Sequence, residues 1–390
     1  MQKKLNRKNI VNLLFLFSIL LIPFYFFRFN ILSIPTTLYE IVLYISFATT
    51  ISLRFSYSKL KTSFIIAGLI LVIVALFSAL CPNGSVKSLG IWRAYFFDGL
   101  ILTINYTLLK KQLDKKIIVR GLIFSSTLAA VIAIILFVLG TKTIDGRLLD
   151  LDMISPNYLS LYLSSIIVLA TVYIAEVERK NIFLVCATFV MLVALYLTYS
   201  RGGVVAIIVA LAFYLVSKIN KANKFKNIVY ILLAVAFVVG GYFLFRPNFG
   251  SHGRVGNSSN IRFYIWETTL EIIGQNPIVG VGLNNYQTYF SELTKDRINY
   301  PEYISPQALT AHNLYLHLIA IGGPLFLLAF IFLIYKSKFY KSENYLKYAL
   351  LSLFIYGFFD TPIFRNDLSA VFWLIIALSI QGISKDENSN

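Results

Sequence analysis

The chain has 390 residues, of which 58% are hydrophobic and only 14% are charged, and its formal net charge at pH 7 is +17. Soluble domains carry roughly 25% charged residues, so this composition excludes a soluble globular protein. It predicts an all-α, polytopic membrane protein built from helices of about 20 residues, the length that crosses a bilayer.

Twelve apolar segments of about this length follow one another along the chain. They are expected at residues 11–27, 37–53, 63–80, 93–109, 117–139, 157–175, 182–199, 203–217, 227–245, 313–335, 345–359 and 368–383. Together they predict one integral membrane domain over residues 1–390, a bundle of about 12 transmembrane helices.

The 35 Lys and Arg residues divide unequally between the two sides of this bundle. If the N-terminus lies inside, 23 of them fall on the side of the termini and 12 on the opposite side. Cytoplasmic loops are enriched in Lys and Arg, so both termini are expected in the cytoplasm. The positive charge therefore reflects membrane topology, and membrane lipids rather than nucleic acid are the expected partners.

Residues 246–312, between the ninth and tenth segments, form the one long outer loop. Loops beyond about 12 to 15 residues are usually functional or disordered. Between Arg262 and Ile273 apolar residues recur at helical spacing, and Asn276-Pro277 ends this pattern. We expect short amphipathic helices on the outer surface and a loop folded over the mouth of the bundle.

Three places on the outer side carry candidate catalytic residues: Tyr-Ser-Arg-Gly-Gly at 199–203, Arg262, and His-Asn at 312–313. Guanidinium groups bind phosphate through paired, charge-assisted hydrogen bonds. A neutral imidazole, which titrates near pH 6.5, takes a proton from a hydroxyl group. We therefore expect Arg201, Arg262 and His312 to converge at the outer mouth of the bundle as a catalytic set for a lipid-linked phosphate.

The candidates for substrate binding are Arg147, Gly202, Gly203, Trp266, Tyr286 and Asn313. The glycines leave room for the close approach of backbone or lipid. The arginine is either a third phosphate contact or a plain loop charge. The two aromatic residues either stack on sugar faces or belong to an interfacial belt, and the asparagine either orients the imidazole or caps a helix.

Other polar residues have simpler interpretations. Arg93 and Asp98 lie near or within the fourth segment, where an acid is either functional or part of an internal pair. Asp360 and Arg365 are expected to pair with each other in the last outer loop. His317 is expected to be a buried packing group.

Three stretches, in this order between about residues 180 and 335, resemble the O-antigen ligase and O-antigen polymerase family of bacterial envelope proteins. They are YSRGGVVAIIVALAFYLV, RFYIWETTLEIIGQNPIVGVGLNNYQTYF and AHNLYLHLIAIGGPLFLLAFIFLI. The resemblance implies a glycosyltransferase of the inner membrane that needs neither metal nor cofactor. It would move a glycan from undecaprenyl diphosphate to an acceptor sugar at the periplasmic face. Relatives tend to carry an acid within the stretch that here reads Ile-Ala-Ile-Gly-Gly-Pro at 319–324, so the acceptor side of the site is expected to differ.

Several alternatives stay open at this point. The acceptor is either a sugar of the lipid A core, as for a ligase, or another lipid-linked repeat, as for an O-antigen or capsular polysaccharide polymerase. Attack by a hydroxyl that His312 deprotonates implies inversion at the anomeric carbon. A twelve-span secondary transporter would place ionisable residues near the bilayer midplane, and a non-catalytic scaffold would not need the two arginines and the histidine.

Overall fold

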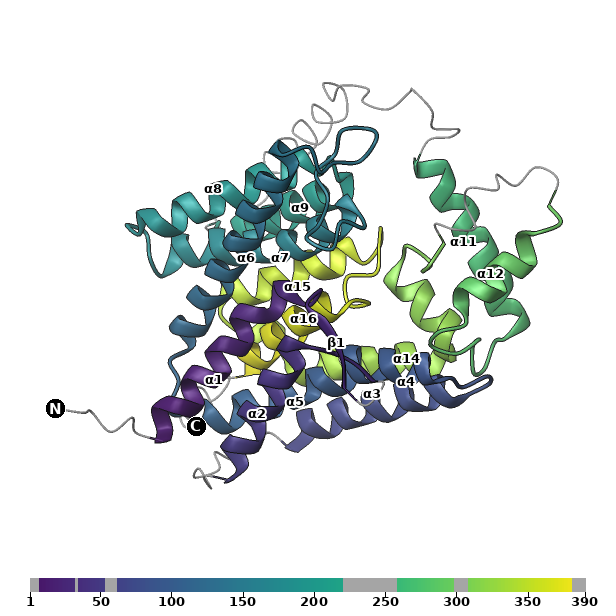
Figure 1. Ribbon diagram of the computed structural model, residues 1–390, viewed down its shortest axis with the longest axis horizontal. Helices are drawn as coiled ribbons and strands as arrows, with labels where there is room; N and C mark the ends of the chain where they lie inside the picture. The colour runs from purple at the N-terminus through teal and green to yellow at the C-terminus, as the bar shows by residue number, and fades with distance from the viewer. Residues whose placement is uncertain (1–6, 32–33, 53–61, 220–257, 298–307, 381–390) are drawn as a thin grey trace. The chain divides into compact units, whose positions relative to one another are not determined.

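The computed structural model describes residues 7–31, 34–52, 62–219, 258–297 and 308–380 (Figure 1). As the composition predicts, the chain is mostly helical with little strand. It divides into two compact units. The first unit comprises Met1–Gly121, Val255–Phe339 and Gly357–Gln381, and the second comprises Leu122–Arg254, Tyr340–Tyr356 and Gly382–Asn390. The expected single membrane domain stays a prediction.

The first unit contains most of the described helices. They are α1 (Arg7–Leu21), α2 (Leu38–Ser52), α3 (Thr62–Leu80), α4 (Val86–Trp92), α5 (Asp98–Leu109), α11 (Ser258–Gln275), α12 (Tyr286–Thr294), α14 (Leu314–Ser337) and α16 (Asn366–Ser379). A 3-10 turn (Ile22–Phe24) follows α1, and a π-helical turn (Arg93–Phe97) joins α4 to α5. Strands β1 (Arg28–Ile31) and β2 (Ile34–Thr37) form an antiparallel pair.

The second unit is built around α15 (Asn344–Tyr356), which packs against α7 (Pro156–Glu176) and α9 (Arg201–Ser217). The helix α8 (Ile182–Leu197) packs against α7. The helix α6 (Lys115–Val138) begins in the first unit and continues into the second, and a 3-10 turn (Phe339–Lys341) lies at the other boundary.

Eleven of the twelve predicted segments coincide with helices, and the ninth, 227–245, lies outside the described residues. Within the described residues, four helices are long and apolar enough to cross a membrane: Ser63–Leu80, Lys115–Val138, Pro156–Glu176 and Leu314–Lys341. Five further apolar helices have 10–17 residues. These helices indicate a membrane protein, but a twelve-span bundle is not confirmed, because most of the helices are shorter than a full span.

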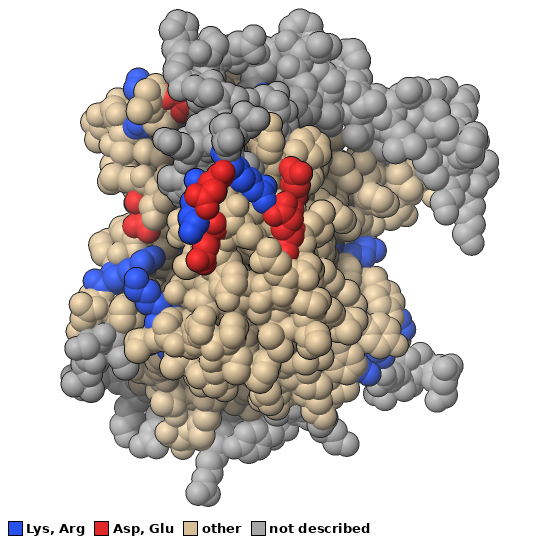
Figure 2. All heavy atoms as spheres, turned by 90° about the vertical axis from the view of Figure 1, so that its right-hand side faces the viewer, with Lys and Arg blue, Asp and Glu red and all other residues tan. Residues whose placement is uncertain are grey.

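Apolar side chains of the first unit point outward as well as inward. On α3 and α14 they are exposed at every third or fourth position, at Ile66, Leu69, Ile73, Phe77, Leu325, Leu328 and Ile331, although α3 and α14 pack against each other. Figure 2 shows a face of the molecule on which charged side chains are few and grouped within a broad uncharged surface. Monomeric soluble proteins rarely expose large apolar patches, so these rows suit contact with lipid.

The helix α14 is broken at Gly323, where φ is 70° and ψ is −176°. Pro324 has no N–H to donate to the Ala320 carbonyl one turn earlier, and the Val281 N–H donates to that carbonyl instead, at 2.8 Å. A Cβ on Gly323 would lie 1.9 Å from the Ile278 carbonyl oxygen, so only glycine fits. The Gly-Gly-Pro sequence thus lets the segment after α11 dock on α14 and satisfy its free backbone groups.

Arg93 and Asp98 belong to an internal polar network of the first unit. Arg93 donates to the Glu40 carboxylate at 2.9 Å and to the Pro35 carbonyl at 2.7 Å. The Tyr44 hydroxyl donates to Asp98, and both carboxyl groups are buried. These contacts connect α2 with the π-helical turn, and they support the internal rather than the functional interpretation of the pair.

Candidate functional site

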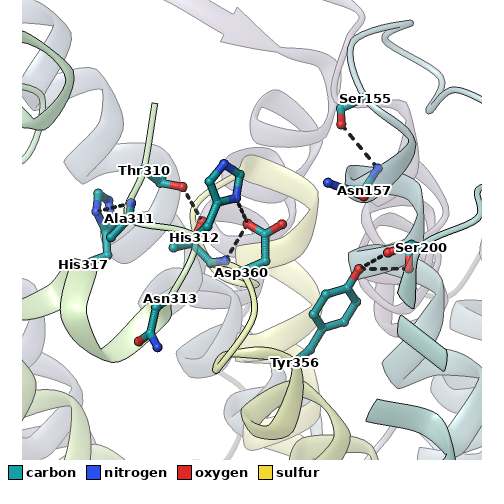
Figure 3. A network of polar contacts seen from close by, with 12 residues as sticks. Ser155, Asn157, Ser200, Thr310, Ala311, His312, Asn313, His317, Tyr356 and Asp360 are labelled. Atoms are coloured by element: carbon teal, nitrogen blue, oxygen red, sulfur yellow. Dashed lines mark hydrogen bonds and ion pairs between the residues drawn. The ribbon is translucent and has the colours of Figure 1, made fainter. Parts of the chain in front are cut away.

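His312 lies in the turn before α14, next to the loop between α15 and α16. Its Nδ1 lies 3.1 Å from Oδ1 of Asp360 (Figure 3). The Asp360 side chain is only 4% exposed, whereas that of His312 is 24% exposed. Burial acts to raise the pKa of the Asp360 carboxyl, but the charge and hydrogen bond of His312, the charge of Arg262 and the Thr361 N–H together lower it below its ordinary value.

The ionised state of Asp360 fixes the tautomer of His312. A carboxylate accepts hydrogen bonds and cannot donate them, so the proton shared with Asp360 belongs to Nδ1 of the imidazole. The lone pair of the neutral ring is then on Nε2. This arrangement gives His312 the form that a general base requires.

Arg262 lies near the start of α11, which packs against both α12 and α14. It is close enough to Asp360 for its positive charge to lower the pKa of that carboxyl. Arg262 thus acts electrostatically on the carboxylate that holds His312, and the convergence of the expected catalytic residues stays a prediction. The combination of a fixed imidazole and a nearby guanidinium suits an anionic substrate whose reaction needs a base.

The backbone at His312 is left-handed, with φ 46°, a conformation that is strained for a residue other than glycine. Hydrogen bonds hold the strain in place. The Asn313 side chain accepts from two N–H groups in the first turn of α14, at 3.0 and 3.1 Å, and the Leu314 N–H donates to the Gly357 carbonyl at 2.7 Å. The structure thus supports the capping interpretation of Asn313, while the imidazole is oriented by Asp360.

Arg201 is the first residue of α9 and follows the short turn that ends α8, as predicted. Tyr199 in this turn has a left-handed backbone, with φ 50°. Arg201 belongs to the second unit, so its convergence with Arg262 and His312 stays a prediction.

The loop that carries Arg147 lies beside the end of α8 in the second unit. The Leu148 N–H donates to the Leu197 carbonyl at 2.9 Å. This hydrogen bond holds the loop against the end of α8, three residues before Ser200 in the sequence. Arg147 itself forms an ion pair with Asp145, with the two side chains 2.9 Å apart. The role of Arg147 in phosphate binding stays a prediction.

Gly202 and Gly203 lie at the contact of α9 with its neighbours. A Cβ on Gly202 would lie 2.6 Å from the Tyr356 ring, and one on Gly203 would lie 2.1 Å from Oγ of Ser160. The Tyr356 hydroxyl is hydrogen-bonded to Ser160 at 3.0 Å and to Ser200 at 2.7 Å, as Figure 3 shows for Ser200. Close helix packing therefore accounts for both glycines, and a direct contact of either with substrate stays a prediction.

The two aromatic candidates differ in their surroundings. Tyr286 is buried, its hydroxyl is hydrogen-bonded to Thr269 at 2.6 Å, and its ring packs edge-on against His317. Trp266 is half-buried and packs against Phe263, and its Nε1–H has no hydrogen-bond partner among the described residues. Of the two rings, that of Trp266 is the more exposed, and a contact of either ring with a sugar stays a prediction.

The expected pair of Asp360 with Arg365 is wrong. Arg365 forms two hydrogen bonds with Asp367, at 2.7 and 2.6 Å, while Asp360 faces His312. Sequence reasoning missed Asp360 as the partner of His312 because 48 residues separate them and no motif spacing links the two. The available signal was an isolated acid at the end of an apolar helix.

Residues 186–331 match the protein family described as O-antigen ligase. No curated protein matches the chain. The matched range contains Arg201, Arg262 and His312, and it ends before Asp360. The resemblance seen in the three sequence stretches is thereby confirmed, and the chain carries an O-antigen ligase family domain at residues 186–331.

Proposed function

We propose that this chain is an O-antigen ligase-type glycosyltransferase. It transfers a glycan from undecaprenyl diphosphate to a sugar of the lipid A core, at the periplasmic face of the inner membrane. The family match supports a membrane enzyme of the ligase or polymerase type in general. The observation that supports the mechanism best is the hydrogen bond between His312 and the buried Asp360, with Arg262 close by.

In the proposed mechanism, Asp360 holds the Nδ1 proton of His312 and Nε2 takes the proton of an acceptor hydroxyl. The hydroxyl oxygen attacks the anomeric carbon as the bond from that carbon to the diphosphate oxygen breaks. Undecaprenyl diphosphate leaves with the electron pair. The imidazolium ion, stabilised by Asp360, then returns its proton to water, and the single displacement inverts the configuration at the anomeric carbon.

The arginines are proposed to bind the diphosphate. Negative charge grows on the leaving group as the glycosyl bond breaks, so guanidinium groups that the protein holds in place stabilise the transition state more than the ground state. Arg262 and Arg201 have this role in the proposal, and Arg147 is a third contact. These positive charges replace a metal ion in the scheme, and Trp266 is proposed to contact the sugar.

The direct test replaces His312 by Ala in the purified protein, reconstituted in lipid with a defined donor lipid and candidate acceptors. Loss of a general base lowers the rate by about 10²- to 10⁴-fold. His252→Ala is the matched control, since it removes another of the three histidines. Undiminished transfer by His312→Ala would contradict the mechanism.

A genetic experiment separates ligase from polymerase. If deletion of the gene leaves long glycan on the undecaprenyl carrier and none on lipopolysaccharide, the ligase proposal stands. Products that carry a single repeat would instead favour an O-antigen or capsular polysaccharide polymerase that uses the same donor.

A further inference from the structure

His317 lies one helical turn beyond His312, inside α14, and is only 3% exposed. Its Nδ1 accepts a hydrogen bond from the Ala311 N–H at 3.4 Å (Figure 3). A backbone N–H can only donate, so Nδ1 must hold a lone pair and the proton of the neutral ring is on Nε2. His317 and His312 are thus in opposite tautomers, because His312 carries its proton on Nδ1.

The ring of His317 also connects the segments that carry the candidate site. One contact is with Phe364, at 4.6 Å between ring centres, four residues after Asp360 in the same loop. The other is with Tyr286, at 5.1 Å. Both contacts are edge-on, at 80°, a favourable geometry for aromatic rings.

The Tyr286 contact continues to α11. The Tyr286 hydroxyl is hydrogen-bonded to Thr269 at 2.6 Å, and Thr269 lies two turns after Arg262 on that helix. His317 therefore touches, directly or through Tyr286, the three segments that bear Arg262, His312 and Asp360. Its hydrogen bond falls on the residue immediately before the strained, left-handed His312.

We propose that His317 is a positioning residue for the proposed glycosyl transfer. Its neutral ring accepts a hydrogen bond from the Ala311 N–H and packs between Tyr286 and Phe364. These contacts fix the turn that directs His312 towards Asp360. Strained backbone persists only where the surrounding structure over-determines it, and His317 supplies one of these constraints from the side opposite to Asp360. The inference rests on the proposed function, in which His312 is the base.

A spectroscopic experiment tests the inference without measuring activity. The chain has only three histidines, so NMR of the full-length protein labelled with ¹⁵N-histidine, in lipid at neutral pH, resolves each ring. His317→Asn and His312→Ala assign the signals. We expect a protonated Nε2 and a bare Nδ1 for His317, and the reverse for His312. A His317 ring that is protonated on Nδ1, or on both nitrogens, overturns the proposal.

The variants test the positioning role. His317→Leu fills the space but removes the acceptor, so the His312 signal should average between tautomers, and kcat should fall roughly 10-fold with the donor KM little changed. His317→Asn places a carbonyl oxygen where Nδ1 was and should restore most of kcat. An unchanged His312 signal and kcat in a folded His317→Leu protein would refute the role, as would His317→Asn being as impaired as His317→Leu.

The controls keep the two proposals distinguishable. If His312→Ala retains full transfer, the proposed function fails, whatever tautomer His317 shows. If His312→Ala is inactive while folded His317→Leu is fully active, only the inference about His317 fails. If His317→Leu does not fold, the wild-type spectrum and the kcat of His317→Asn still decide.

Discussion

The two units present their candidate residues by different means. In the first unit, polar contacts orient one side chain. Asp360 holds His312, and hydrogen bonds of Asn313 and Gly357 hold the turn around it. In the second unit, Arg201 stands at the start of a helix that is placed by packing, where two glycines meet Tyr356.

This difference separates two short motifs, His-Asn at 312–313 and Gly-Gly at 202–203. At the His-Asn motif, the buried Asp360 carboxylate fixes the tautomer of the imidazole. The Gly-Gly motif marks a place where helices approach closely around a neutral hydroxyl network of Tyr356, Ser160 and Ser200. Changes at the His312–Asp360 pair should therefore alter catalysis, and changes at the two glycines should first alter stability.

Asp360→Asn should give the largest effect in the first unit. The amide can donate to Nδ1 of His312 and so favour the wrong tautomer, and a change of this kind lowers kcat by up to about 10⁴-fold. Steady-state transfer by the reconstituted protein measures it. Asp367→Asn is the matched control, since Asp367 is equally buried but pairs with Arg365, and it should lower stability while leaving kcat per folded molecule unchanged. Equal losses of kcat in Asp360→Asn and Asp367→Asn would contradict a specific role of Asp360 in orienting His312.

Gly203→Ala should act on the second unit through folding. The new Cβ would lie 2.1 Å from Oγ of Ser160, which is buried and hydrogen-bonded to Tyr356. Overpacking of this kind costs about 1–3 kcal/mol, to be measured as a lower melting temperature. Gly121→Ala on α6 is the control, because a Cβ there meets nothing within 4 Å, and it should be neutral or stabilising by up to about 1 kcal/mol.

A second change sharpens the Gly203 result. Ser160→Ala in the same chain removes the oxygen in the way, so the double variant should recover part of the lost melting temperature. If Gly203→Ala instead folds like the wild type and loses glycan transfer, the glycine serves the donor directly, and the packing interpretation is wrong.

Most helices of the fold could be predicted, because an apolar run of about 20 residues is a strong local signal. The end of α11 at Gln275 also followed from Asn276-Pro277. The helix α12 is one of the short helices expected in the long outer loop, but its position was missed, because Tyr286–Thr294 is rich in polar and tyrosine residues. The start of α4 at Val86 was missed as well, because its cap, Ser85, lies within a polar stretch.

The candidate site could be predicted only in part. Arg262 and His312 were singled out as candidates because their residue types are rare in an apolar chain and their chemistry is specific, and their catalytic roles stay predictions. Asp360 was assigned the wrong partner, and Tyr356 was not considered at all. Their contacts join residues 48 and 156 positions apart, and only the packed fold brings such residues together.

The smallest expected effect is the pH dependence of stability that Asp360 contributes in the first unit. The pKa of Asp360 in the folded protein lies below its ordinary value of 3.8, so the unfolded chain takes up this proton first as the pH falls. The ionised carboxylate therefore contributes stability that is fully present above about pH 3.8 and is lost as the pH falls through the lower, folded pKa. Asp360→Asn has no such titration, so the gap in melting temperature between it and the wild type should narrow as the pH falls below about 3.8. Ser160→Ala removes only a neutral hydroxyl from the second unit, and its gap to the wild type should stay constant over the same range. A gap for Asp360→Asn that stays equally constant would mean that the carboxylate is not stabilised by His312 and Arg262, and the contrast between the two units would lose its electrostatic basis.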